Sequence, residues 1–399
     1  MPQQACKSFN QRRIAIFDPD PTLATNPSLV CLLEALTHSG ARVDALMPAS
    51  GRFPSMDSMV TRYPFPRRFS LWYGGIRTTL RSWWECVQWT QVDRMFSAEI
   101  HDLILGVDSL GIIRGYEYAR RLHIPLVYLS FEIFFRDELS SRAEIKEKQH
   151  ECTASQFADL VIIQDRWRAQ LLAAENGLSL EQFEYLPVSP GGAQRVQKSD
   201  YLRRRFDLSE RQTIVLHSGS FAEWTYAYEL LENVTTWPKD FILVVHTRYK
   251  PSWTNRCVQA IQQAKLPNVV LSTDPLPMDE YEQLVASADI GLVLYKPVPP
   301  SRYEQKNIQT IGLSSGKFSS YMKYGLPVIS IGQRSYAQLL ADYAFGENID
   351  SFREMSAALN RVRSNYAHYR AEAQRLFSEK LDFDIHWPRL AARLLEVMK

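Results

Sequence analysis

The sequence contains few cysteines and no long apolar run. Its five cysteines are scattered over 399 residues without CxxC spacing, which argues against a disulfide framework and against a zinc site. No stretch approaches the roughly 18 to 20 apolar residues that cross a bilayer. The N-terminal segment is polar and then basic, without the apolar core of a signal peptide. We therefore expect a cytoplasmic protein with reduced thiols and no bound metal.

An excess of charge of one sign is also lacking. The formal net charge is +2, too close to neutral for nucleic acid to be the main partner. Residues 52–91 are a local exception, because six arginines there alternate with aromatic side chains against only Asp57 and Glu85. Residues 62–90 could contact the inner face of an anionic membrane or a lipid-linked acceptor. The alternative is that these aromatics belong to an ordinary core.

Apolar runs alternate with amphipathic stretches along the first half of the chain. A run at 14–17 is followed by a turn-rich loop, a helical pattern that stops at Gly40, and a second apolar run. The same alternation recurs at 102–107, in HIPLVYLSF and in ADLVIIQD, each with a helical pattern beside it. Such repeated strand–helix units predict a doubly wound parallel sheet, here over residues 1–190.

The pattern pauses after Pro187 in a stretch rich in small and polar residues, which we interpret as a linker. It restarts near residue 200 and continues to about 378, which predicts a second Rossmann-like domain. The helical tail at 385–399 is expected to pack back on the first domain. In α/β proteins ligands bind at the carboxyl ends of the strands and between domains, so we expect two domains facing a cleft.

The most informative segment runs from Gly312 to Ile329. Small residues precede a predicted helix that Gly325 ends, and a strand follows. Free N–H groups at a helix start favour a phosphate. Gly316 would let the backbone approach it, Lys317 would add positive charge, and the hydroxyls of Ser314 and Ser315 could donate hydrogen bonds. Ile311 and Phe318 exclude a Walker P-loop. The alternative is a capped helix that carries a surface lysine.

Three further segments are candidates for donor binding. Ser218, Gly219 and Ser220 follow the predicted strand TIVL and could surround a diphosphate, although this is also the composition of an ordinary turn. Arg248 closes another strand and could hold phosphate by a bidentate contact, or it could be a surface arginine. Glu304 lies in the charged loop that leads into the Lys317 segment.

Two carboxylates at predicted strand ends are candidates for catalysis. Glu132 follows the strand PLVY and could act as the general base on an acceptor hydroxyl. Asp108 follows the strand at 102–107 in the same manner. The alternatives are an acid near a helix N-terminus for Glu132, and an Asx turn or helix cap for Asp108.

Together these segments resemble a family. DIGLVLYKP, SSGKF and YMKYGLPVI are similar to the C-terminal domain of GT-B glycosyltransferases of the family-4-like group, and LHSGSFAEW resembles the first turn of that domain. VYLSFEIFF and ADLVIIQDRWRAQLL resemble the acceptor domain of bacterial members. The resemblance implies a GT-B fold, a nucleoside-diphosphate sugar as donor, a glycan or lipid-linked acceptor, and a role in polysaccharide synthesis. No cofactor is implied.

One departure from the family is clear. Family-4 enzymes carry two glutamates, of which one contacts the donor sugar and the other the ribose, and their positions correspond to Gly312 and Ser320 here. We therefore expect a hexosyltransferase-like enzyme whose stereochemistry the sequence does not assign, with Glu304 as a candidate replacement. Two alternatives stay open, namely a nucleotide-sugar epimerase and a non-catalytic subunit that binds a partner transferase.

Overall fold

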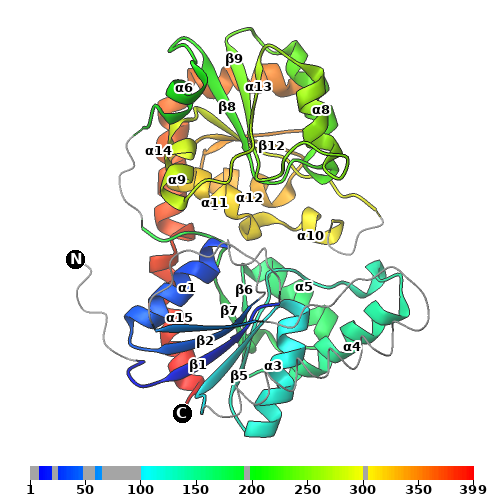
Figure 1. The fold of residues 1–399 in the computed structure, drawn as a ribbon, viewed down its shortest axis with the longest axis vertical. Helices are drawn as coiled ribbons and strands as arrows, with labels where there is room; N and C mark the ends of the chain where they lie inside the picture. Colours follow the sequence, from blue (N-terminus) through cyan, green and yellow to red (C-terminus); the bar gives the residue numbers. More distant parts are fainter. Residues whose placement is uncertain (1–8, 20–25, 48–58, 65–99, 193–197, 300–303) are drawn as a thin grey trace. The chain divides into compact units, whose positions relative to one another are not determined.

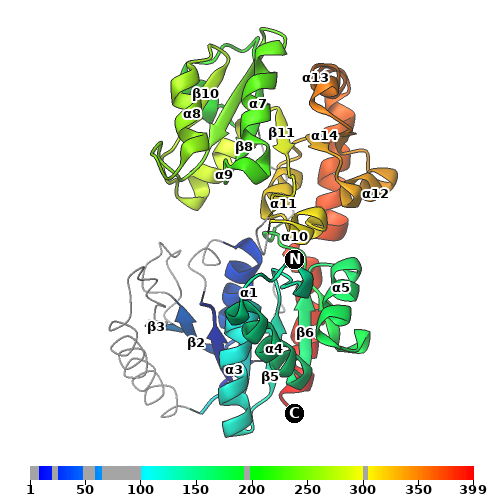
Figure 2. The same ribbon diagram turned by 90° about the vertical axis from the view of Figure 1, so that its right-hand side faces the viewer.

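A computed structural model describes residues 9–19, 26–47, 59–64, 100–192, 198–299 and 304–399. The chain divides into two compact units. Unit 1 comprises Met1–Pro187 and His386–Lys399, and unit 2 comprises Val188–Ile385. Unit 2 thus begins at Val188 and ends at Ile385, outside the range of 200–378 expected for the second domain at both ends. Figures 1 and 2 show a sheet with its helices in each unit.

Unit 1 is built on a parallel sheet of seven strands in the order β3-β2-β1-β4-β5-β6-β7. The strands are β1 Arg13–Phe17, β2 Arg42–Met47, β3 Val60–Pro64, β4 Leu103–Val107, β5 Leu126–Leu129, β6 Leu160–Ile163 and β7 Phe183–Tyr185. All residues of β4, β5 and β6 are buried. Near-continuous apolar strands are what a parallel sheet covered on both faces requires.

The helices of unit 1 are α1 Pro27–His38, α3 Asp108–Leu122, α4 Arg142–Phe157, α5 Arg166–Asn176 and the part of α15 Phe383–Val397 that belongs to it. Asn26 caps α1 by accepting the N–H groups of Ser28 and Leu29. Gly40, where the helix was predicted to end, lies two residues after α1 and has a φ of +95°. Helix α15 is tied to the unit by the stacked rings of Trp387 and Phe9, 5.9 Å apart.

Unit 2 has a parallel sheet of six strands in the order β10-β9-β8-β11-β12-β13. The strands are β8 Thr213–Ser218, β9 Phe241–His246, β10 Val269–Ser272, β11 Ile290–Val293, β12 Val328–Ile331 and β13 Gly346–Ile349. The helices are α6 Tyr201–Phe206, α7 Ala227–Asn233, α8 Arg256–Ala264, α9 Met278–Ser287, α10 Lys306–Gln309, α11 Gly316–Lys323, α12 Arg334–Asp342, α13 Met355–Ser364 and α14 Tyr366–Leu376. Two core clusters of buried apolar side chains accompany the sheet.

In each sheet, the direction in which successive strands are added reverses at one internal position. In unit 2 the chain passes from β8 outward to β9 and β10, and then returns to place β11 on the other side of β8. In unit 1 the corresponding reversal lies between β1 and β4. Ligands of open α/β sheets bind at the carboxyl ends of the strands beside such a switch point. The loops after β8, β11 and β4 are therefore the places where functional side chains are expected.

The fold confirms the prediction of two doubly wound α/β sheets and shows elements that the pattern did not reveal. Strands β3, β7 and β13 and helices α4, α6, α12, α13 and α14 were not expected. Of the predicted membrane-contact segment 62–90, residues 62–64 lie in β3, and the remainder lies outside the described residues.

Candidate functional site

The two segments predicted to bind a diphosphate meet at the switch point of unit 2. The Ser218–Ser220 turn follows β8, and the Ser315–Lys317 segment begins α11. They are joined through Tyr321, one turn further along α11, because the Tyr321 hydroxyl accepts the Ser218 N–H at 3.0 Å and lies 3.0 Å from the Ser218 Oγ. Lys317 is close enough to His217 to affect its protonation electrostatically. These contacts place the small residues and the lysine in one site.

Lys317 is the central charge of this site. Its side chain is partly buried, and its Nζ lies 5.0 Å from the centroid of the Tyr295 ring. Among the described residues no carboxylate forms an ion pair with it. Burial lowers the pKa of the Lys317 ammonium to about 7. A desolvated cation without a counter-ion is costly to hold, and an anionic ligand would relieve that cost.

Helix α11 begins with two N–H groups that have no partner among the described residues, those of Gly316 and Lys317. The next N–H, of Phe318, is accepted at 3.2 Å by the side chain of Ser315, which is the N-cap. The Ser315 hydroxyl also lies 2.7 Å from the Tyr295 hydroxyl. Ser315 is therefore engaged as a cap, and the free donors for a ligand are the two backbone amides and the ammonium.

The remaining small residues of the segment have distinct roles. Gly316 does not have a positive φ, so its backbone conformation does not require glycine. A requirement for glycine at this position would come from the space that a side chain would occupy. The Ser314 hydroxyl donates to the Ile311 carbonyl at 2.5 Å. Gly325 follows α11 at φ +61° and donates its N–H to the Met322 carbonyl, as expected for a helix stop.

The turn after β8 combines a fixed hydroxyl with an open glycine. Ser218 is buried, with its Oγ between the hydroxyls of Tyr281 and Tyr321 at 3.1 and 3.0 Å. Gly219 has φ +98°, and a Cβ built on it would meet no atom within 4 Å. A side chain there would be disfavoured by the backbone angle, and the space above the turn is open. The Ser220 carbonyl lies 3.0 Å from the His217 Nε2.

His217 is held neutral beneath this turn. The ring is fully buried, and burial, followed by the nearby Lys317 charge, lowers its pKa to about 3. His246 at the end of β9 is similar, since burial lowers its pKa to about 4 and its Nδ1 lies 3.0 Å from the Ser272 hydroxyl. Near neutral pH neither imidazole therefore adds positive charge beside the Gly219 turn.

Arg248 and Glu304 are the two other charged residues predicted to bind the donor. The Arg248 side chain is exposed, with its guanidinium 5.3 Å from the Tyr249 ring centroid. Glu304 is partly buried, and its carbonyl accepts the Val298 N–H at 2.7 Å. Neither of these two contacts involves the Lys317 segment.

In unit 1 the two candidate carboxylates are linked through the backbone. Asp108 begins α3 at φ +50°, directly after β4. Its Oδ1 accepts the N–H groups of Phe131 at 2.7 Å and Glu132 at 3.0 Å. Asp108 thus fixes the loop after β5, and the Glu132 side chain is exposed at that loop.

Arg168 supports the same loop and was not predicted from the sequence. The side chain is fully buried, donating to the Gln164 Oε1 at 2.8 Å and to the Phe131 carbonyl at 2.7 Å. Burial lowers its pKa, whereas the charges of Glu132, Asp165 and Asp108 act in the opposite direction. The sequence RWR predicts only the start of a helix. Nothing in the sequence indicates that Arg168, the third residue of α5, is buried.

Solved structures similar to this chain share its architecture over nearly its whole length. HepE of Anabaena, in complex with UDP and glucose, is 15% identical with a TM-score of 0.69, covering 96% of this chain and 99% of that one. Sucrose-phosphate synthase from Thermosynechococcus elongatus is 14% identical with a TM-score of 0.71, covering 97% and 100%. WaaG, a glycosyltransferase involved in lipopolysaccharide biosynthesis, is 15% identical with a TM-score of 0.61, covering 96% and 99%. Neither a protein-family model nor a curated protein matches the sequence.

The chain has the GT-B fold. The resemblance that the motifs indicated is therefore confirmed at the level of fold. Within this GT-B chain, the Ser218 turn and the Lys317 helix occupy the switch point of the second unit, and Asp108 follows the switch-point strand of the first.

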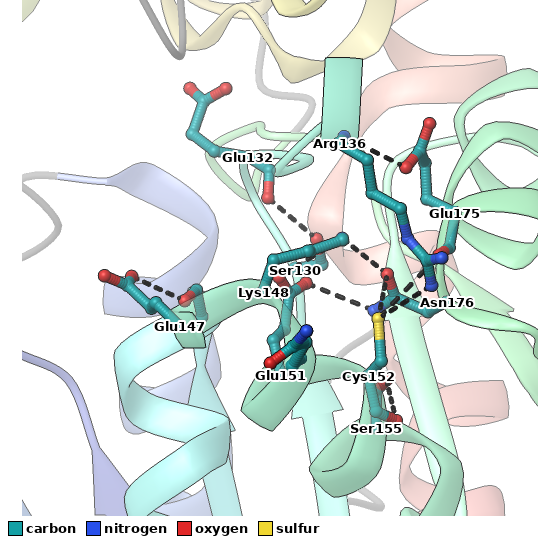
Figure 3. A network of polar contacts seen from close by, with 12 residues as sticks. Ser130, Glu132, Arg136, Glu147, Lys148, Glu151, Cys152, Ser155, Glu175 and Asn176 are labelled. Atoms are coloured by element: carbon teal, nitrogen blue, oxygen red, sulfur yellow. Dashed lines mark hydrogen bonds and ion pairs between the residues drawn. The ribbon is translucent and has the colours of Figure 1, made fainter. Parts of the chain in front are cut away.

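A buried polar network below the Glu132 loop was also missed by the sequence analysis. Lys148 donates to Asn176 Oδ1 at 2.6 Å and to Glu151 Oε2 at 3.2 Å. The Glu151 Oε1 accepts the Tyr128 hydroxyl at 2.8 Å, and burial followed by the Glu151 charge raises the pKa of Tyr128. Figure 3 shows the Glu132 carboxylate directed away from this network. The network joins α4, α5 and β5, so it is structural support for the GT-B unit.

The described part of this GT-B chain has neither a membrane-spanning helix nor a cluster of metal ligands. Its helices include none that is both long enough and apolar enough to cross a bilayer. Its His, Cys, Asp and Glu side chains form no group of three or more that could hold a metal ion.

Proposed function

We propose that this protein is a glycosyltransferase that moves a sugar from a nucleoside-diphosphate sugar to a hydroxyl acceptor. The observation that carries the proposal is Lys317, a desolvated ammonium without a carboxylate partner among the described residues, at the start of a helix with two free N–H groups. The fold adds support, since HepE was solved with UDP and with UDP-glucose. No cofactor besides the donor is proposed.

The donor diphosphate would lie at the start of α11. Charge-assisted hydrogen bonds from the N–H groups of Gly316 and Lys317 and from the ammonium would stabilise its negative charge. That charge grows as the bond between the sugar and the diphosphate breaks, so donors held in place before the reaction lower the barrier. The open Gly219 turn would let the backbone approach the same group. Arg248 and Glu304 stay candidates for contacts further out on the donor.

The acceptor would bind on unit 1, where Glu132 is the proposed general base. A carboxylate that accepts the proton of the attacking hydroxyl makes the oxygen a better nucleophile. Asp108 would act by holding the Glu132 backbone, because its Oδ1 is occupied by the two loop N–H groups. The acceptor class is a glycan or a glycolipid, and a location at the inner membrane face is part of the same proposal.

The first experiment compares UDP binding to the parent chain and to Lys317→Ala by calorimetric titration. Hydrogen bonds to charged groups contribute roughly 1.5–3 kcal/mol each, so the variant should bind about 10- to 150-fold more weakly. Lys323→Ala is a matched control, since Lys323 lies on the same helix but pairs with Glu282. It should bind UDP as the parent does.

Equal UDP affinity of Lys317→Ala and the parent would contradict the phosphate assignment. Binding without turnover of UDP-sugars over a panel of acceptors would favour a non-catalytic subunit. That alternative is supported by the absence of acidic residues at Gly312 and Ser320. Hydrolysis or epimerisation of the donor without acceptor would favour an epimerase.

A further inference from the structure

A cavity lies in unit 2, at the amino-terminal edge of its sheet. Its volume is about 380 Å³, and Thr213 and Ile290, the first residues of β8 and β11, lie in its wall. A strand rises about 3.3 Å per residue, so the length of β8 separates this cavity from the Gly219 turn by roughly 16 Å. Substrates of open α/β sheets bind at the carboxyl ends. This cavity is therefore separate from the proposed donor site.

Charged side chains dominate the wall of this cavity. Four are cationic and two are acidic: Lys198, Arg203, Arg211, Arg363, Glu210 and Asp289. The Asp289 carboxylate is already occupied, because it pairs with Lys198 and accepts the Ile214 N–H at 2.8 Å and the Arg203 Nη2 at 3.2 Å. Glu210 lies 3.6 Å from the Arg203 Nε. The two acidic groups of the wall therefore balance its four positive charges only in part.

Arg211 carries the unbalanced charge. Arg363 pairs with Asp240, and the guanidinium of Arg203 donates to Asp289 and to the carbonyls of Ser209 and Gln212. By contrast, the Arg211 guanidinium forms no hydrogen bond or ion pair with the described residues, and it is exposed at the cavity. A planar fork of five N–H donors is thus available to an anion.

Lys198 and Tyr366 complete the arrangement. The Lys198 ammonium has further N–H groups besides the one directed at Asp289, and it lies 5.2 Å from the centroid of the Tyr366 ring. The cavity thus combines a free guanidinium, a shared ammonium and an aromatic wall. Its volume is within the range of about 300–1,000 Å³ that small-molecule sites occupy.

We propose that this cavity binds the phosphate group of a small phosphorylated metabolite, at a site distinct from that of the sugar donor. Arg211 would hold two phosphate oxygens in a bidentate contact, and Lys198 would add a charge-assisted hydrogen bond. The ring of Tyr366 would pack against the organic part of the ligand. Ligand binding at this site is separate from the proposed sugar transfer, because a ligand bound here is not a reactant.

The experiment is a calorimetric titration of the full chain with inorganic phosphate, ribose 5-phosphate and acetate. Loss of one bidentate charged contact at an exposed site should weaken ribose 5-phosphate binding about tenfold in Arg211→Ala. Arg204→Ala is the matched control, since Arg204 is equally cationic and nearby in sequence but pairs with Asp200 and does not line the cavity. It should bind as the parent does, and acetate should bind more weakly than phosphate.

Lys317→Ala separates this site from the donor site. If the metabolite binds in the cavity, that variant keeps its affinity for ribose 5-phosphate even where UDP binding is lost. The proposal is overturned if the parent binds neither phosphate probe below about 10 mM. It is also overturned if Lys317→Ala, and not Arg211→Ala, loses the binding, or if acetate binds as tightly as ribose 5-phosphate.

Discussion

At the scale of single residues, Lys317 couples donor binding to pH. Its pKa of about 7 means that half of the unliganded protein lacks the ammonium charge near neutral pH. A bound diphosphate favours the charged form, so binding requires a proton to be taken up above pH 7. The depressed pKa of His217, about 3, keeps that neighbour neutral throughout this range.

We expect UDP-glucose to bind about tenfold more weakly at pH 8 than at pH 6, because the charged fraction of Lys317 falls by that factor. UDP-glucose is the right ligand, since its diphosphate does not titrate in this window. Calorimetry at both pH values measures the effect. An equal loss of UDP-glucose affinity between pH 6 and pH 8 in Lys317→Ala would show that another group is responsible.

A substitution at Glu132 should affect catalysis and leave donor binding unchanged. Glu132→Gln keeps the size of the side chain and removes its basicity, so turnover should fall by about a hundredfold or more while UDP affinity stays unchanged. A radiolabelled-sugar transfer assay beside the UDP titration measures both. The exposed Glu181, which precedes β7 and does not lie in the loop after β5, is changed to Gln as a control for loss of an acidic side chain in unit 1. Unchanged turnover of Glu132→Gln would remove it as the base.

At the scale of elements, the junction between β4 and α3 depends on Asp108. An aspartate tolerates the left-handed backbone at φ +50° better than most residues, and its carboxylate satisfies two N–H groups of the loop after β5. The side chain therefore connects two neighbouring strands through their loops.

Asp108→Ala should lower the free energy of unfolding of unit 1 by about 1–3 kcal/mol, because two N–H groups lose their acceptor. Asp108→Asn keeps an acceptor oxygen and tolerates positive φ, so it should keep both stability and most of the turnover. Urea unfolding and transfer assays of both variants test this. A stable but inactive Asp108→Asn would instead give the carboxylate a role in the chemistry.

The elements that the sequence predicted are those with a local signal. Buried strands such as β5 and β8 are continuous apolar runs, and α11 has a cap at Ser315 and a stop at Gly325. The edge strands β3, β7 and β13 and the polar helix α4 were missed. Helix α4 was missed because it buries charged side chains in a network that only tertiary packing creates. The Lys317 segment and the Gly219 turn were predicted separately as phosphate-binding segments, the first from the free N–H groups of a helix start and the second from the composition of a strand-to-loop turn. The burial of Arg168 had no such local signal.

At the scale of the whole molecule, unit 1 is discontinuous in sequence, because residues 386–399 return to it after the chain has completed unit 2. The returning helix contributes the Trp387 ring to Phe9 and the Arg389 guanidinium, 2.8 Å from Glu184. The stability of unit 1 therefore depends on residues that follow unit 2.

Removal of residues 386–399 should destabilise unit 1 and leave UDP binding by unit 2 in place. Calorimetric unfolding should then show an earlier transition for unit 1, whereas the transition that UDP shifts upward should stay where it is in the parent. The loss of UDP stabilisation in the truncated chain would contradict this assignment. Arg389→Ala, which removes only one ion pair, provides the milder comparison.

The neighbouring positions of β8 and β11 have a consequence for folding kinetics. Their pairing, Ile290 with Val215 and Gly291 with Leu216, joins residues separated by two strands, β9 and β10, and the helices between them. Closing such a long loop costs chain entropy before the contact stabilises anything, so pairings of this kind form late. The nascent chain therefore carries the Gly219 turn well before Lys317 has been synthesised. Nucleotide should then act on refolding only in the last phase, once the two sides of the switch point have met.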